Sequence, residues 1–319
     1  MPRAQLDPAL SVRVISVRVL RYDAVAPLGD DRPAHVRAAS GMAWLGGRLA
    51  VIQDDAAFIA YVGGGEVSAL ALPRGAGGRR RFEVGLGNKM EKLDLEACVA
   101  VPRMEPGGFT PTGEADELWA FGSGSAPARE KIAVIGYATR IHDAAPLYRR
   151  LREELESDVN IEGVALVADA LWLFHRGNTS TDDRGPAVVR LARAELACWL
   201  AGEGPVPEIK ASERYDLGAV HGWPLGFTDA VAVGARVFYL AAAEASPNAI
   251  DDAGVVASQL GVIDGDTVRA CELLIDGAPA KAEGLAFDPK QPNHAWLAID
   301  PDDVDAPARL YEIALEGPW

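Results

Sequence analysis

The chain has 319 residues, of which 46 are Asp or Glu and 31 are Lys or Arg, so its formal net charge at pH 7 is −15. With 49% hydrophobic and 24% charged residues, its composition is that of a folded globular protein and not of a disordered or collagen-like chain. The negative charge argues against nucleic acid and membrane surfaces as partners, because both are anionic. Three cysteines, at positions 98, 198 and 271, are too few and too scattered for a disulfide framework.

The N-terminal segment lacks the features of a targeting sequence. Arginines at positions 3, 13, 18 and 21 interrupt it, and its uncharged stretches are too short for the apolar centre of a signal peptide. Nowhere does the chain contain an apolar run of about 18 residues, which a membrane-spanning helix needs. We therefore expect a cytoplasmic protein.

Short β-rich segments follow one another along the whole chain, separated by Gly, Pro, Asp and Asn. The clearest are residues 12–20, 48–52, 67–72, 118–121, 132–137, 171–174, 237–240 and 310–313. Two segments, 146–157 and 191–200, have helical character, and both are too short to set the fold class. The pattern predicts an all-β protein.

An internal repeat runs through this series of strands. Five times, a small or acidic residue opens a short apolar strand, and a second apolar strand follows it. The opening residues are Ser40, Glu96, Glu162, Asp229 and Glu283, at intervals of 54 to 67 residues. Each interval has room for about four strands, which is the content of one blade of a β-propeller.

The two ends of the chain bear on the number of blades. One strand, 12–20, precedes the first repeat, and one strand, 310–315, follows the last pair. If the N-terminal strand completes the last blade, the ring closes without an unpaired element, which favours five blades. Six blades remain an alternative if residues 64–84 or 200–220 contain a further blade, and a pair of β-sandwiches is the competing fold. No linker interrupts the repeats, so we expect residues 1–319 to form one domain.

Propeller geometry predicts where the polar residues of the repeats meet. The innermost strands line a central channel, and antiparallel pairing places the start of each first strand beside the end of the second. Glu96, Glu162, Asp229 and Glu283 would then point at one axis. At an effective dielectric constant near 20, two such charges about 6 Å apart repel by about 3 kcal/mol. Something must therefore neutralise them.

Three kinds of compensation fit the sequence. Lys92, Arg129 and Arg176 are candidates to reach the carboxylates with their positive charges, and raised pKa values are a second solution. A hard cation such as Ca²⁺ or Mg²⁺, held by Glu162 and Glu283, is the third. The opposing interpretation is structural, with the acidic ring joining neighbouring blades through salt bridges and backbone amides.

Polar residues also follow the second strands of two repeats. Gly122-Ser123-Gly124-Ser125 with Arg129 has the composition of an anion-binding loop, but a plain turn needs the same small residues. His175 and Arg176 end an otherwise apolar strand, and each is expected to touch either a ligand or a neighbouring carboxylate. No GxSxG elbow, Walker loop or dinucleotide fingerprint occurs.

Several of these motifs carry a family resemblance. The openings Glu162-Gly163-Val164-Ala165 and Glu283-Gly284-Leu285-Ala286, with the variant Asp94-Leu95-Glu96-Ala97, resemble those of bacterial propellers related to the esterase-like phytase family. Together with Lys92, the run 122–125 with Arg129, and the residues 160–163 and 174–178, they are similar to an uncharacterised family of bacterial propeller proteins. The resemblance spans about residues 40–301 and implies the fold and a polar site on the channel axis.

Two functional hypotheses follow. In the first, the protein is a binding propeller whose axial pocket holds a small polar or anionic ligand, or a divalent cation, using Glu96, Glu162, Asp229, Glu283, Lys92, Arg129, His175 and Arg176. In the second, it is a metal-dependent hydrolase of phosphate esters or lactones that uses the same carboxylates. We favour binding, because no residue is an obvious activated nucleophile. The sequence leaves the oligomeric state open.

Overall fold

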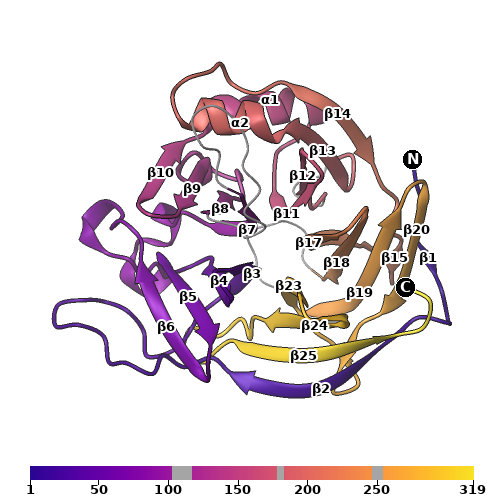
Figure 1. The fold of residues 1–319 in the computed structure, drawn as a ribbon, viewed down its shortest axis with the longest axis horizontal. Helices are drawn as coiled ribbons and strands as arrows, with labels where there is room; N and C mark the ends of the chain where they lie inside the picture. The colour runs from indigo at the N-terminus through magenta and orange to yellow at the C-terminus, as the bar shows by residue number, and fades with distance from the viewer. Residues whose placement is uncertain (103–116, 178–182, 246–253) are drawn as a thin grey trace.

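The computed structural model of the chain describes residues 1–102, 117–177, 183–245 and 254–319. Five sheets stand around a central axis, each with its first strand innermost (Figure 1). The predicted five-bladed β-propeller is therefore confirmed. The predicted helical segments are also present, as α1 (Ala145–Leu155) and α2 (Arg193–Leu200).

The first three blades each contain four consecutive antiparallel strands. From the axis outward, blade 1 contains β3 (Ala39–Leu45), β4 (Arg48–Gln53), β5 (Phe58–Gly63) and β6 (Glu66–Ala71); blade 2 contains β7 (Leu95–Val101), β8 (Glu117–Gly122), β9 (Lys131–Ile135) and β10 (Thr139–Asp143); blade 3 contains β11 (Ile161–Val167), β12 (Ala170–His175), β13 (Ala187–Ala192) and β14 (Ile209–Arg214). Short 3₁₀ turns join blades 1 and 2, namely η1 (Ala76–Gly78), η2 (Val84–Leu86) and η3 (Lys89–Glu91), and η4 (Pro127–Arg129) follows β8.

The N-terminal segment contributes strands to the last two blades. Blade 4 contains β17 (Gly226–Val233), β18 (Arg236–Glu244), β19 (Val255–Asp264) and β20 (Thr267–Glu272), and β1 (Gln5–Leu6) lies parallel to β20; blade 5 contains β23 (Ala282–Asp288), β24 (Gln291–Ile299), β25 (Arg309–Glu316) and β2 (Ser11–Val19). Strand β2 pairs antiparallel with β25, so the N-terminal strand closes the last blade, as predicted. Two hairpins, β15 (Ala219–Val220) with β16 (Trp223–Pro224) and β21 (Leu274–Ile275) with β22 (Ala278–Pro279), lie between blades.

The hydrophobic core is divided among the blades. Five clusters of buried residues each lie between two neighbouring blades, because a single sheet has two apolar faces and each must pack against the next sheet. Between blades 1 and 2, for example, Ile52 and Ile59 pack with Leu118 and Ile135. The cluster between blades 2 and 3 also takes in α1 and α2. Among the described residues, no helix has the length and apolar character that crossing a bilayer requires.

Candidate functional site

Each innermost strand begins with a β-bulge at the same place in its blade. The pairing register skips one residue between the first and second strands of every blade, and the extra residues are Ser40, Glu96, Glu162, Thr228 and Glu283. A bulge re-aims the side chain of the extra residue, and such bulges often lie beside functional sites. The repeat found in the sequence therefore has a geometric counterpart in all five blades.

The fourth blade corrects the predicted repeat by one residue. The sequence pattern places Asp229 at the strand opening, whereas the structure places Thr228 in the bulge. Because side chains alternate along a strand, this shift sends Asp229 in another direction. Its Oδ1 accepts a hydrogen bond from Ala230 N at 2.8 Å, and its Oδ2 accepts one from Leu285 N of blade 5 at 2.6 Å.

A cavity of about 650 Å³ opens at the end of the channel where the bulges lie. All five blades or their connections contribute to its wall. Residues that precede or open first strands line it together with residues at the ends of second strands, as the antiparallel geometry predicts. The charged side chains of this wall are Asp54, Asp55, Glu83, Asp94, Glu96, Glu162, Glu244, Glu283, Asp300, Asp302 and Asp303, with Arg37, Lys89, Lys92, Arg129, Arg176 and Lys281.

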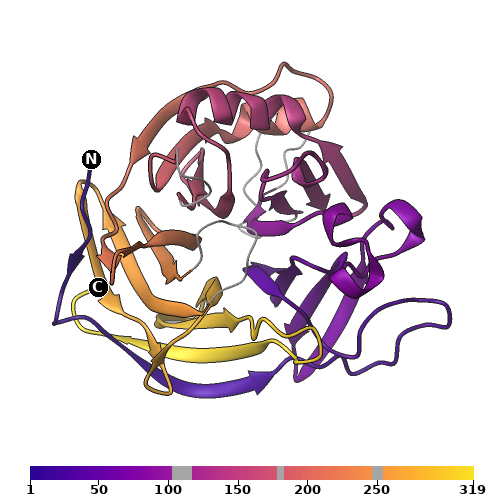
Figure 2. The same cartoon turned by 180° about the vertical axis from the view of Figure 1, so that it is seen from behind.

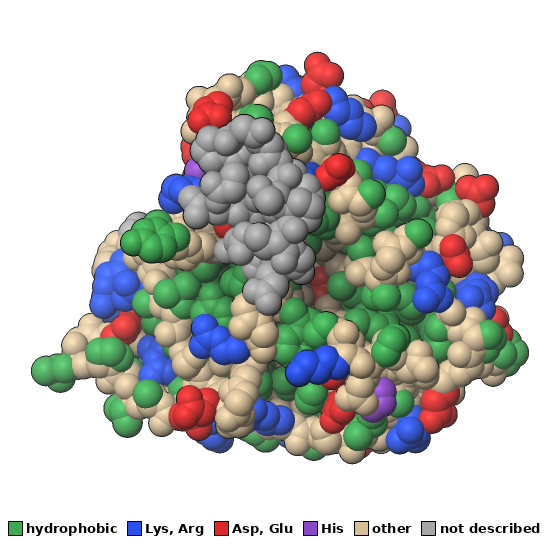
Figure 3. Space-filling model, viewed as in Figure 1, with side chains coloured by type: hydrophobic (Ala, Val, Ile, Leu, Met, Phe, Trp, Pro, Cys, Tyr) green, Lys and Arg blue, Asp and Glu red, His purple; other side chains and the backbone are tan. Residues whose placement is uncertain are grey.

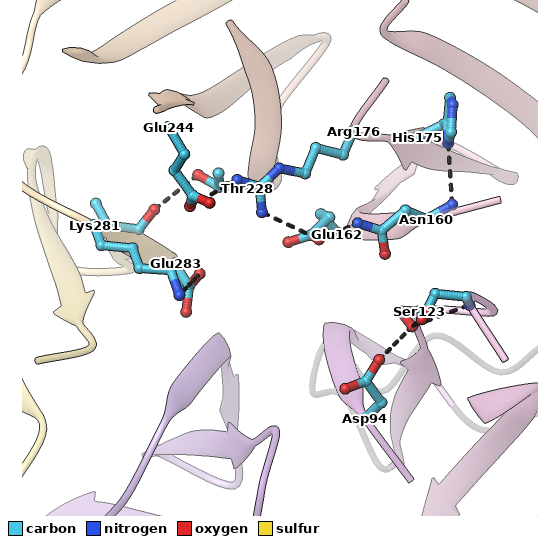
Figure 4. A network of polar contacts seen from close by, with 12 residues as sticks. Asp94, Ser123, Asn160, Glu162, His175, Arg176, Thr228, Glu244, Lys281 and Glu283 are labelled. Atoms are coloured by element: carbon cyan, nitrogen blue, oxygen red, sulfur yellow. Dashed lines mark hydrogen bonds and ion pairs between the residues drawn. The ribbon is translucent and has the colours of Figure 1, made fainter. Parts of the chain in front are cut away.

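The acidic groups outnumber the basic ones in this wall, with eleven carboxylates against six lysines and arginines among the described residues. Arg176 lies between carboxylates from two blades (Figure 4). Arg176, from the end of β12, forms ion pairs with Glu162 at 3.4 Å and with Glu244 of blade 4 at 2.7 Å. Asn160 donates a second hydrogen bond to Glu162 at 2.6 Å.

The densest group of carboxylates lies where blades 1 and 2 meet. Asp54, Asp94 and Glu96 each present a carboxylate oxygen, and the three oxygens lie within 4.8 Å of one another. The Lys92 ammonium pairs with both Asp54 and Asp94, at 2.5 Å from the latter. Burial opposes ionisation of Asp54, but the ammonium of Lys92 keeps the pKa of Asp54 below its usual value. Lys92 thus supplies positive charge at the centre of this group.

The glycine-serine run supports Asp94 and does not form a separate anion cradle. The Ser123 hydroxyl donates a hydrogen bond to Asp94 Oδ2, and Arg129 Nη1 lies 3.1 Å from the same oxygen. Arg129 also donates to the hydroxyl of Ser125 at 2.8 Å. Ser125 and Arg129 reach the cavity wall, so the run provides both a turn and part of the site.

Blade 5 adds a further cluster of charged residues. Lys281 lies 3.3 Å from Glu283 and 2.7 Å from Asp302. Burial, partly offset by the Lys281 ammonium and reinforced by Asp302, raises the pKa of Asp300 to about 7. The acidic run 300–305 therefore contributes three carboxylates to the cavity.

Three glutamates from three blades act on one another electrostatically. Burial is the main reason why the pKa of Glu96 lies far above its usual value. Nearby carboxylates, Glu162 and Glu283 among them, raise it further. The pKa of Glu283 is also far above its usual range, because burial and nearby carboxylates, Glu162 among them, outweigh Lys281. Burial and Glu244 raise the pKa of Glu162 despite Arg176. Of the four carboxylates predicted to share one axis, Glu96, Glu162 and Glu283 thus lie together, whereas Asp229 does not join them.

Glu96 differs from the other two glutamates in its partners. Glu162 is paired with Arg176, and Glu283 is paired with Lys281. Among the ion pairs of the described residues, none involves Glu96, although the charge of Glu96 does raise the pKa of Lys92. Glu96 is therefore the least compensated of the three.

His175 and Asp229 lie apart from the cavity wall formed by the other expected site residues. His175 is fully buried; its Nδ1 accepts a hydrogen bond from Asn160 N at 3.1 Å, and its Nε2 lies 3.3 Å from Asp183 Oδ2. Asp229 joins blades 4 and 5, as described above. The structure brings Glu96, Glu162, Glu283, Lys92, Arg129 and Arg176 to the cavity. Asn178, part of the family motif, lies outside the described residues.

Sequence reasoning missed Lys281 and understated Asp94 and Asn160. Each stands two positions before a bulged glutamate, in the pairs Asp94 and Glu96, Asn160 and Glu162, and Lys281 and Glu283. Both members of every pair line the cavity. The recurring two-residue spacing is visible in the sequence and would have identified all three residues.

The opposite end of the channel is apolar. Inner strands of all five blades line a second cavity of about 450 Å³ there, with Met42, Cys98, Val164, Val231 and Phe287 in its wall. Figure 3 shows this face, with hydrophobic side chains around its centre. Burial, with a smaller contribution from Asp229, raises the pKa of the Cys98 thiol far above its usual value. The two ends of the channel therefore differ sharply in polarity.

Residues 35–315 match a family of unknown function, DUF6929. The chain belongs to this family. The matched span takes in all five inner strands and every residue of the cavity wall described above. A search of curated proteins finds no match.

Solved structures with similar folds are distant. A luciferin-regenerating enzyme is 12% identical, with a TM-score of 0.38, over 88% of this chain and 80% of that one. A chain of the mitotic checkpoint complex is 8% identical, with a TM-score of 0.40, over 97% of this chain and 94% of that one. Apo AztD from Citrobacter koseri is 10% identical, with a TM-score of 0.28, over 81% of this chain and 53% of that one. Similarities this low say nothing about function.

Proposed function

We propose that this DUF6929 protein is a cytoplasmic ligand-binding propeller whose axial cavity binds a positively charged ligand. In the simplest case the ligand is a divalent cation such as Ca²⁺ or Mg²⁺, bound by Glu96, Glu162 and Glu283. The observation that carries the proposal is the convergence of these three glutamates from three blades, each with a raised pKa. Bringing a cation to them relieves their mutual repulsion.

The ligand atoms available suit a hard cation. Ca²⁺ and Mg²⁺ bind carboxylate, amide and water oxygens, and the cavity offers the carboxylates together with the amide oxygen of Asn160. A divalent cation binds the deprotonated form of a carboxyl group, so its binding should release protons from glutamates whose pKa values are raised. Glu96 is the principal candidate ligand, because it makes no ion pair within the described part of the chain.

Thermal unfolding with and without added cation tests the proposal. After chelator treatment, Ca²⁺ or Mg²⁺ at about 100 times its Kd should add about 2.7 kcal/mol of stability and raise the Tm by about 5 °C. Glu96→Gln should lose most of this shift, because an amide cannot supply the charge. Glu66→Gln is the matched control, since Glu66 is exposed at the start of β6.

Two further measurements decide the outcome. Calorimetric titrations in buffers of different ionisation enthalpy should report proton release on cation binding by the wild type. If neither cation binds, or if Glu96→Gln and Glu283→Gln bind as tightly as the wild type, the glutamates are not the ligands and the proposal fails.

A metal-assisted hydrolase is the second candidate. One observation favours it: Asp300, with a pKa of about 7, lines the same cavity as Lys281 and Arg176. A carboxyl group poised near neutrality can transfer a proton, and the basic side chains can stabilise developing negative charge. Turnover of p-nitrophenyl phosphate or a simple lactone that requires added metal and is lost in Glu162→Gln would support this function. Absence of turnover with every metal tested would leave only the binding function.

A further inference from the structure

The cavity is larger than a bare ion requires. Its volume of about 650 Å³ falls within the range of roughly 300–1,000 Å³ that is typical of sites for organic ligands. The cavity therefore has room for more than a metal ion.

The cavity wall also contains exposed apolar side chains. Val84 and Met90, from the connection between blades 1 and 2, and Val304, from the connection after β24, line the cavity and are 76%, 62% and 49% exposed. Scattered exposed apolar side chains are common, but here all three line one charged cavity. We call Val84, Met90 and Val304 the apolar rim.

The segment that carries Val84 and Met90 is firmly anchored. Arg37, a buried residue that precedes β3, pairs with Glu83 at 2.9 Å, directly beside Val84. Asn88 accepts a hydrogen bond from Glu83 N at 3.1 Å and donates one to the Arg81 carbonyl at 2.9 Å. Figure 2 shows this segment beside blades 1 and 2. Val84 and Met90 are therefore held in place and do not need to be ordered when a ligand binds, which favours affinity.

We propose that the natural ligand of this cavity is a small organic ammonium ion that carries an apolar group, with its charge on the glutamates and its apolar group on the rim. This inference rests on the proposed function, because it requires the glutamates to bind positive charge. Glu96, Glu162 and Glu283 form what we call the acidic floor. A bare metal ion contacts this floor and leaves the rim exposed to water. An amphipathic ammonium ion uses both surfaces at once, and burying its apolar group adds the hydrophobic contribution.

Calorimetric titration of the full chain with n-hexylamine, methylamine and 1-hexanol, beside CaCl₂, tests the inference. Each methylene buried on the rim should tighten binding roughly fourfold. Hexylammonium should therefore bind at least tenfold more tightly than methylammonium. Uncharged 1-hexanol should bind weakly, since it lacks the charge that the glutamates need.

Substitutions separate the rim from the floor. Met90→Ser and Val84→Ser should weaken hexylammonium binding at least threefold and leave Ca²⁺ binding unchanged, whereas Glu96→Gln should weaken both. Because Met90 and Val84 are exposed, these variants should keep the wild-type Tm. Leu28→Ser is the matched control, since Leu28 is fully exposed and lies outside the cavity wall.

The outcomes distinguish this inference from the proposed function. If Ca²⁺ binds but hexylammonium binds no more tightly than methylammonium, or if the rim variants bind hexylammonium normally, the inference is overturned and cation binding stands. If hexylammonium binds and Ca²⁺ does not, the inference stands and the divalent-cation form of the proposed function is wrong. If no cation binds, both fail.

Discussion

Asp229 Oδ2 accepts a hydrogen bond from the backbone N–H of Leu285 at 2.6 Å, and this bond joins blade 4 to blade 5 at the channel. Burial raises the pKa of Asp229 far above its usual value, despite the two backbone amides that favour its charged form. Asp229 follows the bulge of blade 4, at a position where the other blades have glycine or alanine. In blades 1, 3 and 5 the residue after the bulge is Gly41, Gly163 or Gly284, and these positions face the next blade.

Removing this carboxyl group should destabilise the fold. Asp229→Ala leaves the amides of Leu285 and Ala230 without their acceptor, at a cost of about 1–3 kcal/mol in the free energy of unfolding. Asp229→Asn retains an acceptor and should cost less. Urea denaturation measures both, with Glu203→Ala, an exposed position, as control. If Asp229→Ala is as stable as the control variant, the inter-blade bond has no structural role.

Closure of the ring depends on the residues around β2. Leu20 is fully buried between blades 5 and 1, and its N–H bonds the Ala308 carbonyl at 3.0 Å. Leu20→Ala should cost about 2–5 kcal/mol, as for other large-to-small core substitutions. Val17→Ala, within β2 itself, should change stability by less than about 0.5 kcal/mol, because Val17 is 56% exposed. Equal Tm values for the two variants would contradict this view of closure.

Arg176 should be essential for the stability of the ligand-free protein. Arg176→Met leaves Glu162 and Glu244 without their shared cation, and breaking a buried ion pair costs about 3–5 kcal/mol. Arg184→Met provides the comparison, because its ion pair with Glu156 is exposed and should contribute about 0–1 kcal/mol. Chemical denaturation of both variants measures the difference. Similar losses in the two variants would show that Arg176 does not compensate buried charge.

The empty protein should become less stable as the pH rises from about 4 to about 7. Asp300 has a pKa of about 7 in the folded state and about 4 when unfolded, so only the folded state holds its proton within this window. Asp55, with a pKa raised to about 6 mainly by burial and by Asp54, acts in the same direction. Asp300→Asn cannot ionise, so its free energy of unfolding should vary less between pH 5 and pH 7.5. If the free energy of unfolding varied with pH in the same way for the variant and the wild type, Asp300 would not be a source of the pH dependence.

Much of the architecture could be predicted from the order of residues. Alternating apolar strands, a repeat of 54 to 67 residues and one strand at each end indicate five blades closed by β2, because strand period and edge pairing are local rules. The same repeat indicated that Glu96, Glu162 and Glu283 share an axis. The spacing of Lys281 to Glu283 was equally local and was overlooked.

Only the tertiary structure determined which residues occupy the bulges and line the cavity, because both depend on exact strand register and on contacts between blades. In blade 4, both Thr228 and Asp229 fit a loose opening pattern, and only the pairing of β17 with β18 determines which of them occupies the bulge. The apolar rim next to the acidic floor could not be read from the sequence either, because Val84, Met90 and Val304 come from connections far apart in the chain. A sequence encodes the period of a strand locally, whereas the side chains that meet across a cavity depend on how separate blades pack.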